Sequence, residues 1–220
     1  MTDTTMEGGN SMAGQDNVLE VKDLRVSFNS IAGKVQAVRG VNFHVKKGET
    51  IAIVGESGSG KSVSIKTVMG ILSRNAVIEE GSVLYGGQDL TKISEKEYEE
   101  IRGKKIGLIF QDPLSSLNPL MKIGKQIAEV YTENFGLSPK EAKERALKIM
   151  EDVGIPNPEL RYNQYPFQFS GGMRQRIVIA IALANDPDIL ICDEPTTALD
   201  VTVQARILQL IKKIKNIHYQ

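Results

Sequence analysis

The sequence lacks several features that would mark a specialised class of protein. Its 220 residues contain one cysteine, Cys192, which excludes an internal disulfide and fits a reducing compartment. Lys plus Arg and Asp plus Glu both number 27, so no bulk charge draws the chain to nucleic acid. The longest purely apolar run, at 177–184, is far too short to span a bilayer, and no secretory signal opens the chain. These absences predict an ordinary globular protein of the cytoplasm.

A glycine-rich stretch, GESGSGKS at 55–62, carries the strongest chemical signal. It satisfies the pattern G-x-x-x-x-G-K-[ST] between an apolar segment at 51–54, expected as a buried strand, and a helical pattern. Such a loop points successive backbone N–H groups at phosphate oxygens, while the lysine reaches the terminal phosphates and the serine offers a hydroxyl to Mg²⁺. The predicted nucleotide-binding residues are Gly55, Glu56, Ser57, Gly58, Ser59, Gly60, Lys61 and Ser62.

A second apolar strand, ILIC at 189–192, ends in two carboxylates. Asp193 is placed to hold Mg²⁺ and Glu194 to polarise an attacking water. Gln111 follows another predicted strand, and its amide is placed to reach a metal or a water. Each feature alone is better interpreted as a turn or loop residue; together with 55–62 they favour the functional interpretation. Cys192 lies inside the strand and is expected to be a small core residue.

A second candidate anion site lies at FSGGMRQR, residues 169–176. Ser170 caps a predicted helix, and Gly171 and Gly172 allow a phosphate to approach its start. From these eight residues alone, an ordinary capped helix is slightly favoured.

The remaining patterns predict an α/β domain over 18–220 after a loose tail at 1–17. Alternating apolar residues before 46 predict strands with one buried and one solvated face, and 113–184 is expected to be a helical subdomain inserted in the domain. Two capping boxes, Ser94 with Glu97 and Ser138 with Glu141, mark helix starts.

Taken together, these segments resemble the ATP-binding subunits of ABC transporters. The order is Walker A at 55–62, the Gln loop at 111, the signature at 169–173, Walker B at 189–194 and the D-loop at 198–200. FQDPLSSLNP, QFSGGMRQR and DEPTTALDVTVQA are similar to the oligopeptide and dipeptide importer branch. The resemblance implies a P-loop NTPase core with an N-terminal antiparallel β subdomain and an inserted α-helical subdomain.

The resemblance also implies roles and partners. Phe28 matches the aromatic that stacks on adenine, Lys61 a phosphate ligand, Glu194 the catalytic base and Asp200 the D-loop aspartate; Ser62, Gln111 and Asp193 match the Mg²⁺ contacts. Ser170, Gly171 and Gly172 would bind the γ-phosphate of ATP held by a second, identical or paralogous, ATP-binding subunit. The implied location is the cytoplasmic face of the membrane, beside permease subunits and, indirectly, a substrate-binding protein.

The sequence departs from the family pattern at three places. Met173 replaces the general family's glutamine, as is usual in the peptide branch, and Phe167 stands where that branch commonly has histidine. The family places a switch histidine about thirty residues after the D-loop aspartate, beyond Gln220, and His218 falls too early for that role. A strand that lies between the Walker strands in the family is missing with it. We therefore expect a C-terminally truncated chain without its last strands.

Two hypotheses follow from this expectation. The first is an ATP-hydrolysing subunit that energises import of di- or oligopeptides by closing a dimer on ATP. The alternative is a nucleotide-binding fragment without turnover. A third, an ABC-type ATPase that acts on nucleic acid, is disfavoured by the zero net charge.

Overall fold

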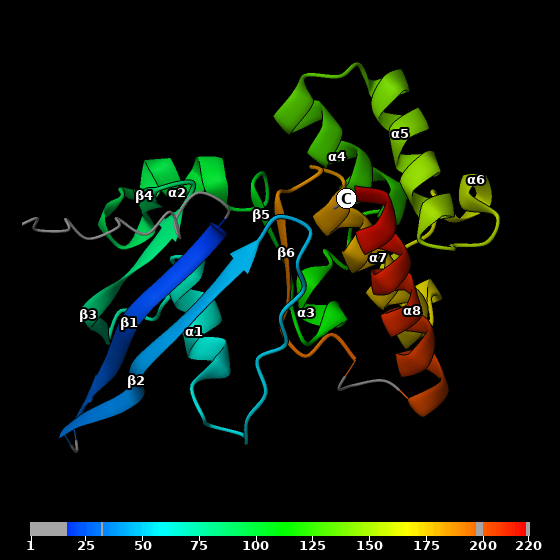
Figure 1. The fold of residues 1–220 in the computed structure, drawn as a ribbon. Coiled ribbons are helices and arrows are strands. Elements are labelled where there is room, and N and C mark those ends of the chain that lie inside the picture. The colour runs from blue at the N-terminus through cyan, green and yellow to red at the C-terminus, as the bar shows by residue number, and fades with distance from the viewer. Residues whose placement is uncertain (1–16, 32, 197–199, 219–220) are drawn as a thin grey trace, which may run out of the picture.

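The computed structural model describes residues 17–31, 33–196 and 200–218, and the side chains of all these except 114 and 215–218. The described chain has an antiparallel sheet at one side, a helical part at the other, and a parallel strand pair between them (Figure 1). This arrangement confirms the predicted α/β class with an antiparallel N-terminal sheet. Of the predicted tail, Asn17 already belongs to the first strand, and 1–16 lie outside the described residues.

The antiparallel sheet has the strand order β2-β1-β3-β4. Its strands are β1 (Asn17–Ser30), β2 (Gly33–Lys46), β3 (Ala76–Tyr85) and β4 (Gln88–Asp89), followed by the short helix η1 (Leu90–Lys92). One face packs on α1 (Lys61–Val68) and α2 (Glu95–Ile101). The apolar residues that meet there include Leu24, Val26, Val38, Val68, Leu90 and Tyr98.

The parallel pair consists of β5 (Ile106–Ile109) and β6 (Ile189–Cys192). Ile106 and Ile189, which are register partners, pack on the apolar cluster beneath the antiparallel sheet. Ile109, at the other end of β5, packs on the cluster inside the helical part. The pair therefore joins the two hydrophobic cores.

The helical part follows β5 along the chain. It contains α3 (Pro113–Ser116), α4 (Ile123–Phe135), α5 (Pro139–Asp152), α6 (Pro158–Arg161), the 3₁₀ turn η2 (Pro166–Gln168) and α7 (Gly171–Leu183), and α8 (Val201–His218) packs against it. Ile127, Met150, Ile177, Ile179 and Ile207 are fully buried in its core. Both predicted capping boxes form, at the starts of α2 and α5.

The prediction of a buried strand at 51–54 is wrong. No strand pairing includes these residues, and the side chains of Ile53 and Val54 are 41% and 88% exposed. A strand exists only where a neighbour completes its hydrogen-bond ladder. Among the described strands none lies beside 51–54, so this segment reaches the glycine loop as an extended connection.

Candidate active site

The glycine loop ends directly at the start of α1. Gly60 is the N-cap residue, with φ 94, and no side chain caps the helix. A Cβ added to Gly60 would lie 2.6 Å from the carbonyl oxygen of Ala37 on β2, so glycine allows the loop to pack on the sheet. Gly58 is also left-handed, at φ 80, but an added Cβ would meet nothing within 4 Å. The loop is thus anchored at one glycine and borders open space at another, as a phosphate cradle requires.

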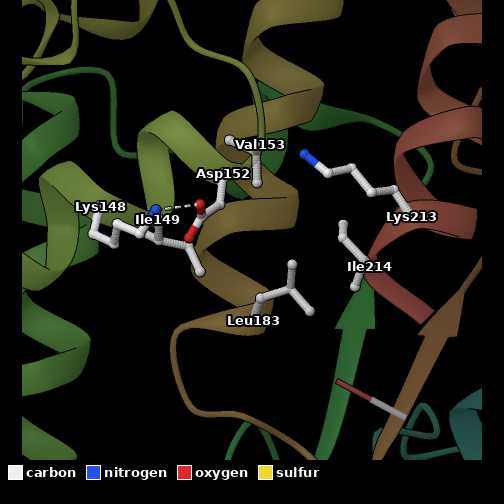
Figure 2. Close-up of a pocket in the computed structure, with 7 residues that line it drawn as sticks. All are labelled: Lys148, Ile149, Asp152, Val153, Leu183, Lys213 and Ile214. Atoms are coloured by element: carbon white, nitrogen blue, oxygen red, sulfur yellow. Dashed lines mark hydrogen bonds and ion pairs between the residues drawn. The ribbon is translucent and has the colours of Figure 1, made fainter. Parts of the chain in front are cut away.

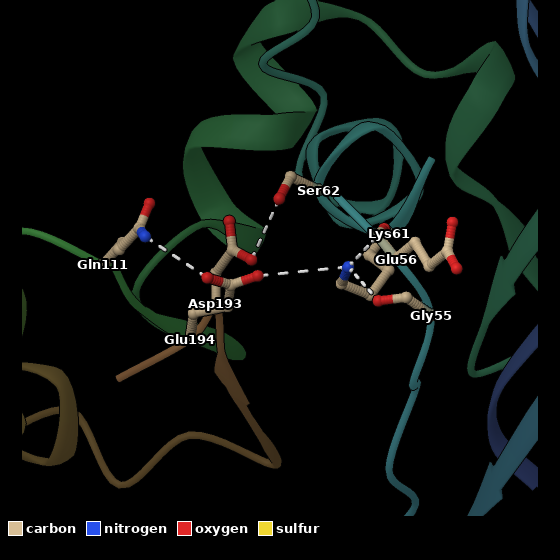
Figure 3. A network of polar contacts seen from close by, with 7 residues as sticks. All are labelled: Gly55, Glu56, Lys61, Ser62, Gln111, Asp193 and Glu194. Atoms are coloured by element: carbon tan, nitrogen blue, oxygen red, sulfur yellow. Dashed lines mark hydrogen bonds and ion pairs between the residues drawn. The ribbon is translucent and has the colours of Figure 1, made fainter. Parts of the chain in front are cut away.

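Lys61 lies over the loop that precedes it. Its Nζ donates hydrogen bonds to the carbonyl oxygens of Gly55, at 2.7 Å, and Glu56, at 3.0 Å (Figure 3). The same ammonium is 4.0 Å from Oε1 of Glu194, and its side chain is 18% exposed. A largely covered cation therefore points into the space between the loop and the end of β6.

Ser62 and Asp193 bring the two predicted halves of the site together. The Ser62 hydroxyl donates to Oδ1 of Asp193 at 3.1 Å, although the residues are 131 positions apart. Asp193 is held by its backbone N–H, which donates to the carbonyl of Ile109 at 3.0 Å and so extends the β5–β6 ladder by one bond. The sheet therefore fixes where this carboxylate lies.

Glu194 and Gln111 form the next pair. The Gln111 amide Nε2 donates to Oε2 of Glu194 at 3.2 Å, so the carboxylate lies between this amide and the Lys61 ammonium (Figure 3). Glu194 adopts φ 49, a left-handed conformation that is uncommon for a residue with a side chain. Such conformations concentrate at functional sites, where the surrounding structure holds them.

The donor set suits Mg²⁺ chemically. A serine hydroxyl, an aspartate carboxylate and a glutamine amide are oxygen-bearing ligands of the kind that hard cations take. The described residues contain no group of three or more His, Cys, Asp or Glu side chains that would hold a metal by themselves. Ser62, Gln111 and Asp193 therefore fit a cation that receives its remaining ligands from a phosphate and water.

Phe28 lies on β1, away from this network. It is half-buried, and its register partners are Val35 on β2 and Ala76 on β3. Among the described residues, no hydrogen bond or ion pair links this part of the sheet to the loop at 55–62. The packing of Gly60 on β2 is the structural link between them.

The signature segment forms a capped helix start. The exposed Ser170 is the N-cap of α7, and its hydroxyl accepts a hydrogen bond from the backbone N–H of Met173 at 3.4 Å. A Cβ added to Gly172 would lie 2.5 Å from Cγ1 of Val203, so this glycine lets α8 approach α7. No hydrogen bond or ion pair recorded for the described residues joins Ser170, Gly171 or Gly172 to the glycine loop. The two segments predicted to bind anions are therefore not joined to each other within the described chain.

Asp200 caps α8. Its Oδ1 accepts a hydrogen bond from the backbone N–H of Val203 at 3.0 Å, which is a local structural role. The other two residues of the predicted D-loop, 198 and 199, lie outside the described residues. Cys192 is half-buried and packs against the core of the helical part, and burial raises the pKa of its thiol to about 12.

A pocket of about 270 Å³ lies between α5, α7 and α8, away from the site described above (Figure 2). Its floor is apolar, from Ile149, Leu183 and Ile214, and its rim carries Lys148, Asp152 and Lys213. Lys148 is already paired with Asp152 at 2.8 Å. None of the residues predicted to carry chemistry lines this pocket. Among the described helices, moreover, none is long and apolar enough to cross a membrane.

The sequence did not reveal two features of the site. The left-handed conformation of Glu194 has no signal in the residues around it, because glutamate rarely adopts it. The hydrogen bonds from Lys61 to the loop carbonyls follow from the loop's curl and likewise have no separate sequence signature.

Comparison with curated proteins finds close relatives. The chain is 58% identical over 199 residues to the oligopeptide transport ATP-binding protein OppD of Bacillus subtilis (strain 168), covering 90% of this chain and 56% of that protein. It is 56% identical over 202 residues to the dipeptide transport ATP-binding protein DppD of Lactococcus lactis subsp. cremoris (strain MG1363), covering 91% and 58%. The chain therefore spans less than two thirds of the length of these relatives.

Solved structures with the same fold are also found. A dimeric ATP-binding cassette, MJ0796, in a post-hydrolysis state bound to ADP and Pi superposes with a TM-score of 0.78 at 30% identity, covering 91% of this chain and 84% of that one. CbiO1 of Clostridium perfringens, part of the ABC transporter complex CbiONQ, gives 0.77 at 27% identity, covering 93% and 76%. The family described as ABC transporter matches residues 38–197, well over half of the chain. The chain therefore belongs to the ABC transporter family.

Proposed function

We propose that this chain binds ATP with Mg²⁺ and hydrolyses it to energise the import of di- or oligopeptides through a membrane permease. The observation that carries the proposal is the convergence of the glycine loop on the end of β6. Ser62 meets Asp193 at 3.1 Å, and Lys61 and Gln111 approach the Glu194 carboxylate from two sides. The names of the most similar relatives, oligopeptide and dipeptide transport ATP-binding proteins, support the peptide substrate class.

Each residue of the loop has a part in holding the nucleotide. The backbone N–H groups at the start of α1 face the phosphates, and the Lys61 ammonium balances charge on the terminal ones. Ser62, Gln111 and Asp193 would hold Mg²⁺, which would supply Lewis-acid charge to the phosphoryl transfer when bound. Phe28 stacks on the adenine from the sheet.

Glu194 is the proton acceptor of hydrolysis. A water oxygen forms a bond to the γ-phosphorus, the bond from phosphorus to the β–γ bridging oxygen breaks, and ADP leaves with that electron pair. The proton lost by the water passes to the Glu194 carboxylate, which the Gln111 amide orients through Oε2. The Oε1 atom of the same carboxylate lies 4.0 Å from the Lys61 ammonium.

The separation of the two anion sites within one chain supports a dimeric mechanism. Ser170, Gly171 and Gly172 serve the γ-phosphate bound to a second subunit, identical or paralogous, with Asp200 at the seam between them. Closing on two ATP molecules moves the helical parts of both subunits, and this movement is passed to permease subunits at the cytoplasmic face of the membrane. A substrate-binding protein delivers the peptide to that permease.

Steady ATP turnover and ATP-dependent dimerisation, measured on the chain and on Glu194→Gln, test this proposal. We expect the variant to bind ATP, to lose turnover by about 10²–10⁴-fold, and to sediment as a dimer with saturating ATP. Glu133→Gln, an exposed glutamate on α4, is the matched control and should behave as the unchanged chain. A Glu194→Gln variant that turns over normally, or stays monomeric with ATP, would contradict the mechanism.

The second candidate is a chain that binds ATP without turnover. The observation that favours it is the segment 51–54, which leads into the glycine loop without a strand partner among the described residues. Such a loop can hold phosphate yet leave the Lys61 and Glu194 groups too loosely placed for catalysis. The turnover measurement separates the two candidates, because ATP binding with equal background rates for the chain and Glu194→Gln supports only the second.

A further inference from the structure

The start of α7 has weak local support. Ser170 is its N-cap, and the cap hydroxyl accepts from the Met173 backbone N–H at 3.4 Å, longer than the about 2.7–3.2 Å that is usual. In α2 and α5 the third helical residue is a glutamate that accepts a hydrogen bond from the cap residue, whereas in α7 it is Met173. The cap therefore fixes the first turn of α7 less firmly than the two capping boxes fix theirs.

The residue before this cap also lacks its common partner. Phe169 precedes Ser170 and is 3% exposed, in the core of the helical part. In a hydrophobic staple, a residue at this position packs on the fourth residue of the helix and fixes the angle at which the chain enters. The fourth residue of α7 is Arg174, which is not apolar. The angle of the chain at Ser170 is therefore fixed from outside α7.

Arg161, the last residue of α6, lies over the ring of Phe169. Its guanidinium carbon is 5.5 Å from the ring centroid, within the about 6 Å at which a cation is attracted to an aromatic ring. Its Nη1 donates to Oε1 of Gln164 at 3.3 Å, and its Nε is buried with no hydrogen-bond partner among the described residues. A long side chain that turned to water would hydrate every donor. Hydrogen bonding therefore does not explain this placement, and attraction to the ring does.

Backbone contacts with α4 hold Arg161 in turn. The N–H group of Ile123 donates to the carbonyl of Gln164 at 2.8 Å, and that of Gly124 donates to the carbonyl of Tyr162 at 3.0 Å. A Cβ on Gly124 would lie 2.1 Å from the Tyr162 ring, so this ring lies directly on the start of α4. The segment that presents the guanidinium is thus bonded to a helix of 13 residues. Arg161 is a fixed point against which Phe169 is placed.

We propose that Arg161 is a positioning residue for the start of α7. Its guanidinium holds Phe169, and through it Ser170, in the orientation in which the first N–H groups of α7 receive the phosphate of ATP bound to a second subunit. The inference rests on the proposed function, because it requires a dimer that closes on ATP. It assigns Arg161 a share in dimer closure and none in the binding of ATP to the chain's own glycine loop.

Loss of the Arg161 cation should lower the fraction of chains in which the start of α7 is correctly oriented. The affinity for a partner falls in proportion to this fraction. A symmetric dimer uses the segment of both subunits, so the same factor enters the dimerisation constant twice. For one cation–ring contact we expect a drop of about threefold in the fraction, and hence a dimerisation constant weakened about tenfold.

Sedimentation with saturating ATP and Mg²⁺ tests the assignment in the Glu194→Gln chain, which is expected to hold the closed dimer. We expect the addition of Arg161→Met to weaken dimerisation about tenfold, with the ATP affinity of the dilute monomer unchanged. Arg161→Lys keeps a cation and should recover part of the loss, although lysine lacks the planar group that stacks on a ring.

The matched control is Lys143→Met in the same Glu194→Gln chain. Lys143 lies over the Tyr162 ring at 5.6 Å, so this change also removes a cation from an aromatic ring of the helical part, but not from Phe169. It should dimerise as the Glu194→Gln chain does. A loss equal to that of Arg161→Met would show that any cation–ring contact of this region has the same effect, and would overturn the specific role of Arg161.

A double-mutant cycle with Phe169→Leu separates positioning from a folding defect. This change removes the ring and keeps an apolar side chain, so it should weaken dimerisation too, and the addition of Arg161→Met should then weaken it no further. Unchanged dimerisation in Arg161→Met, independent losses in the double variant, or an equal loss of monomer ATP affinity would overturn the role of Arg161 alone. A Glu194→Gln chain that stays monomeric with ATP would instead overturn the proposed function, and this inference with it.

Discussion

The Ser62 hydroxyl donates a hydrogen bond to the Asp193 carboxylate across 3.1 Å and so ties the start of α1 to the end of β6. The sequence predicted both residues as contacts of one cation from two motifs far apart. Because each oxygen is held by a regular element, their separation depends on the packing of α1 beside the strand pair. The distance between the Ser62 hydroxyl and the Asp193 carboxylate therefore reports whether the site is assembled.

Removing the Ser62 hydroxyl should weaken cation-dependent nucleotide binding. We expect Ser62→Ala to lower ATP affinity at least tenfold with Mg²⁺ present and little in EDTA, because the phosphate contacts of the loop backbone remain. Isothermal titration with and without Mg²⁺ measures this. Ser64→Ala is the matched control: its hydroxyl donates to the Gly60 carbonyl in the same helix, so it should affect stability and not the Mg²⁺ dependence. Equal losses for both variants would contradict the assignment of Ser62.

Whether Gly172→Ala stabilises or destabilises the protein should depend on one neighbouring residue, Val203. In Gly172→Ala the new Cβ would lie 2.5 Å from Cγ1 of Val203, a stiff β-branched side chain. Overpacking of about 1–3 kcal/mol then exceeds the gain in helix propensity of up to about 1 kcal/mol, so the variant should be destabilised. In a Val203→Ala background the same change should stabilise. Urea unfolding of the four proteins measures both signs, and destabilisation in both backgrounds would show that the contact with Val203 is not responsible.

Local signals explain which parts of the fold were predictable. The capping boxes at Ser94 and Ser138 formed as predicted, because each depends only on residues within one turn. The strand at 51–54 did not form, because a strand depends on a neighbour that is distant in sequence. Apolar residues alone therefore identified a segment that fits a buried strand, without establishing that a partner lies beside it.

The candidate site likewise has features that the sequence predicted and features that it did not. In the structure Ser62 contacts Asp193 and Lys61 lies beside Glu194, while the roles predicted for these residues stay predictions. The packing of Gly172 on Val203 and the pairing of Val35 with Phe28 depend on helix approach and on a register shift in the sheet. Neither contact can be predicted from the local sequence. For Gly172, the sequence suggested room for a phosphate, and the structure adds a packing reason for the same residue.

Cys192 should be unreactive in the folded protein. Burial raises the pKa of its thiol to about 12 from an ordinary 9.0, so the thiolate is absent in the native state at neutral pH. A chromogenic disulfide reagent at pH 8 should label the chain only after urea is added, and this is the one cysteine in the sequence. Native labelling at the rate of the unfolded chain would show that the thiol is accessible.

The same shift predicts a loss of stability in alkali. Below pH 9.0 the thiol is protonated in both the folded and the unfolded state, and the full stability is present. As the pH rises above 9.0 the unfolded thiol ionises while the folded one keeps its proton, so the free energy of unfolding falls. Cys192→Ala should flatten this part of the curve measured by urea unfolding between pH 8 and 10. An unchanged slope in the variant would assign the loss to other groups.

The capping box of α5 should make the stability of the helical part fall as the pH becomes acidic. The Glu141 carboxylate accepts from the Ser138 hydroxyl at 2.5 Å and from the Ser138 backbone N–H at 3.0 Å, and these hydrogen bonds lower its pKa. Because the folded pKa lies below the ordinary value, the contribution is present above that value and is lost as the pH falls through the folded pKa. Ser138→Ala should cost about 1 kcal/mol at pH 7 and less in acid, where the cap is already weakened.

Ser94→Ala removes the same kind of capping box from α2 and should show the same pH dependence, because the same contacts lower the pKa of Glu97 in that box. Urea unfolding of both variants between pH 3 and 7 measures the difference, and a cost for Ser138→Ala that stays constant over this range would show that Glu141 does not act through its charge.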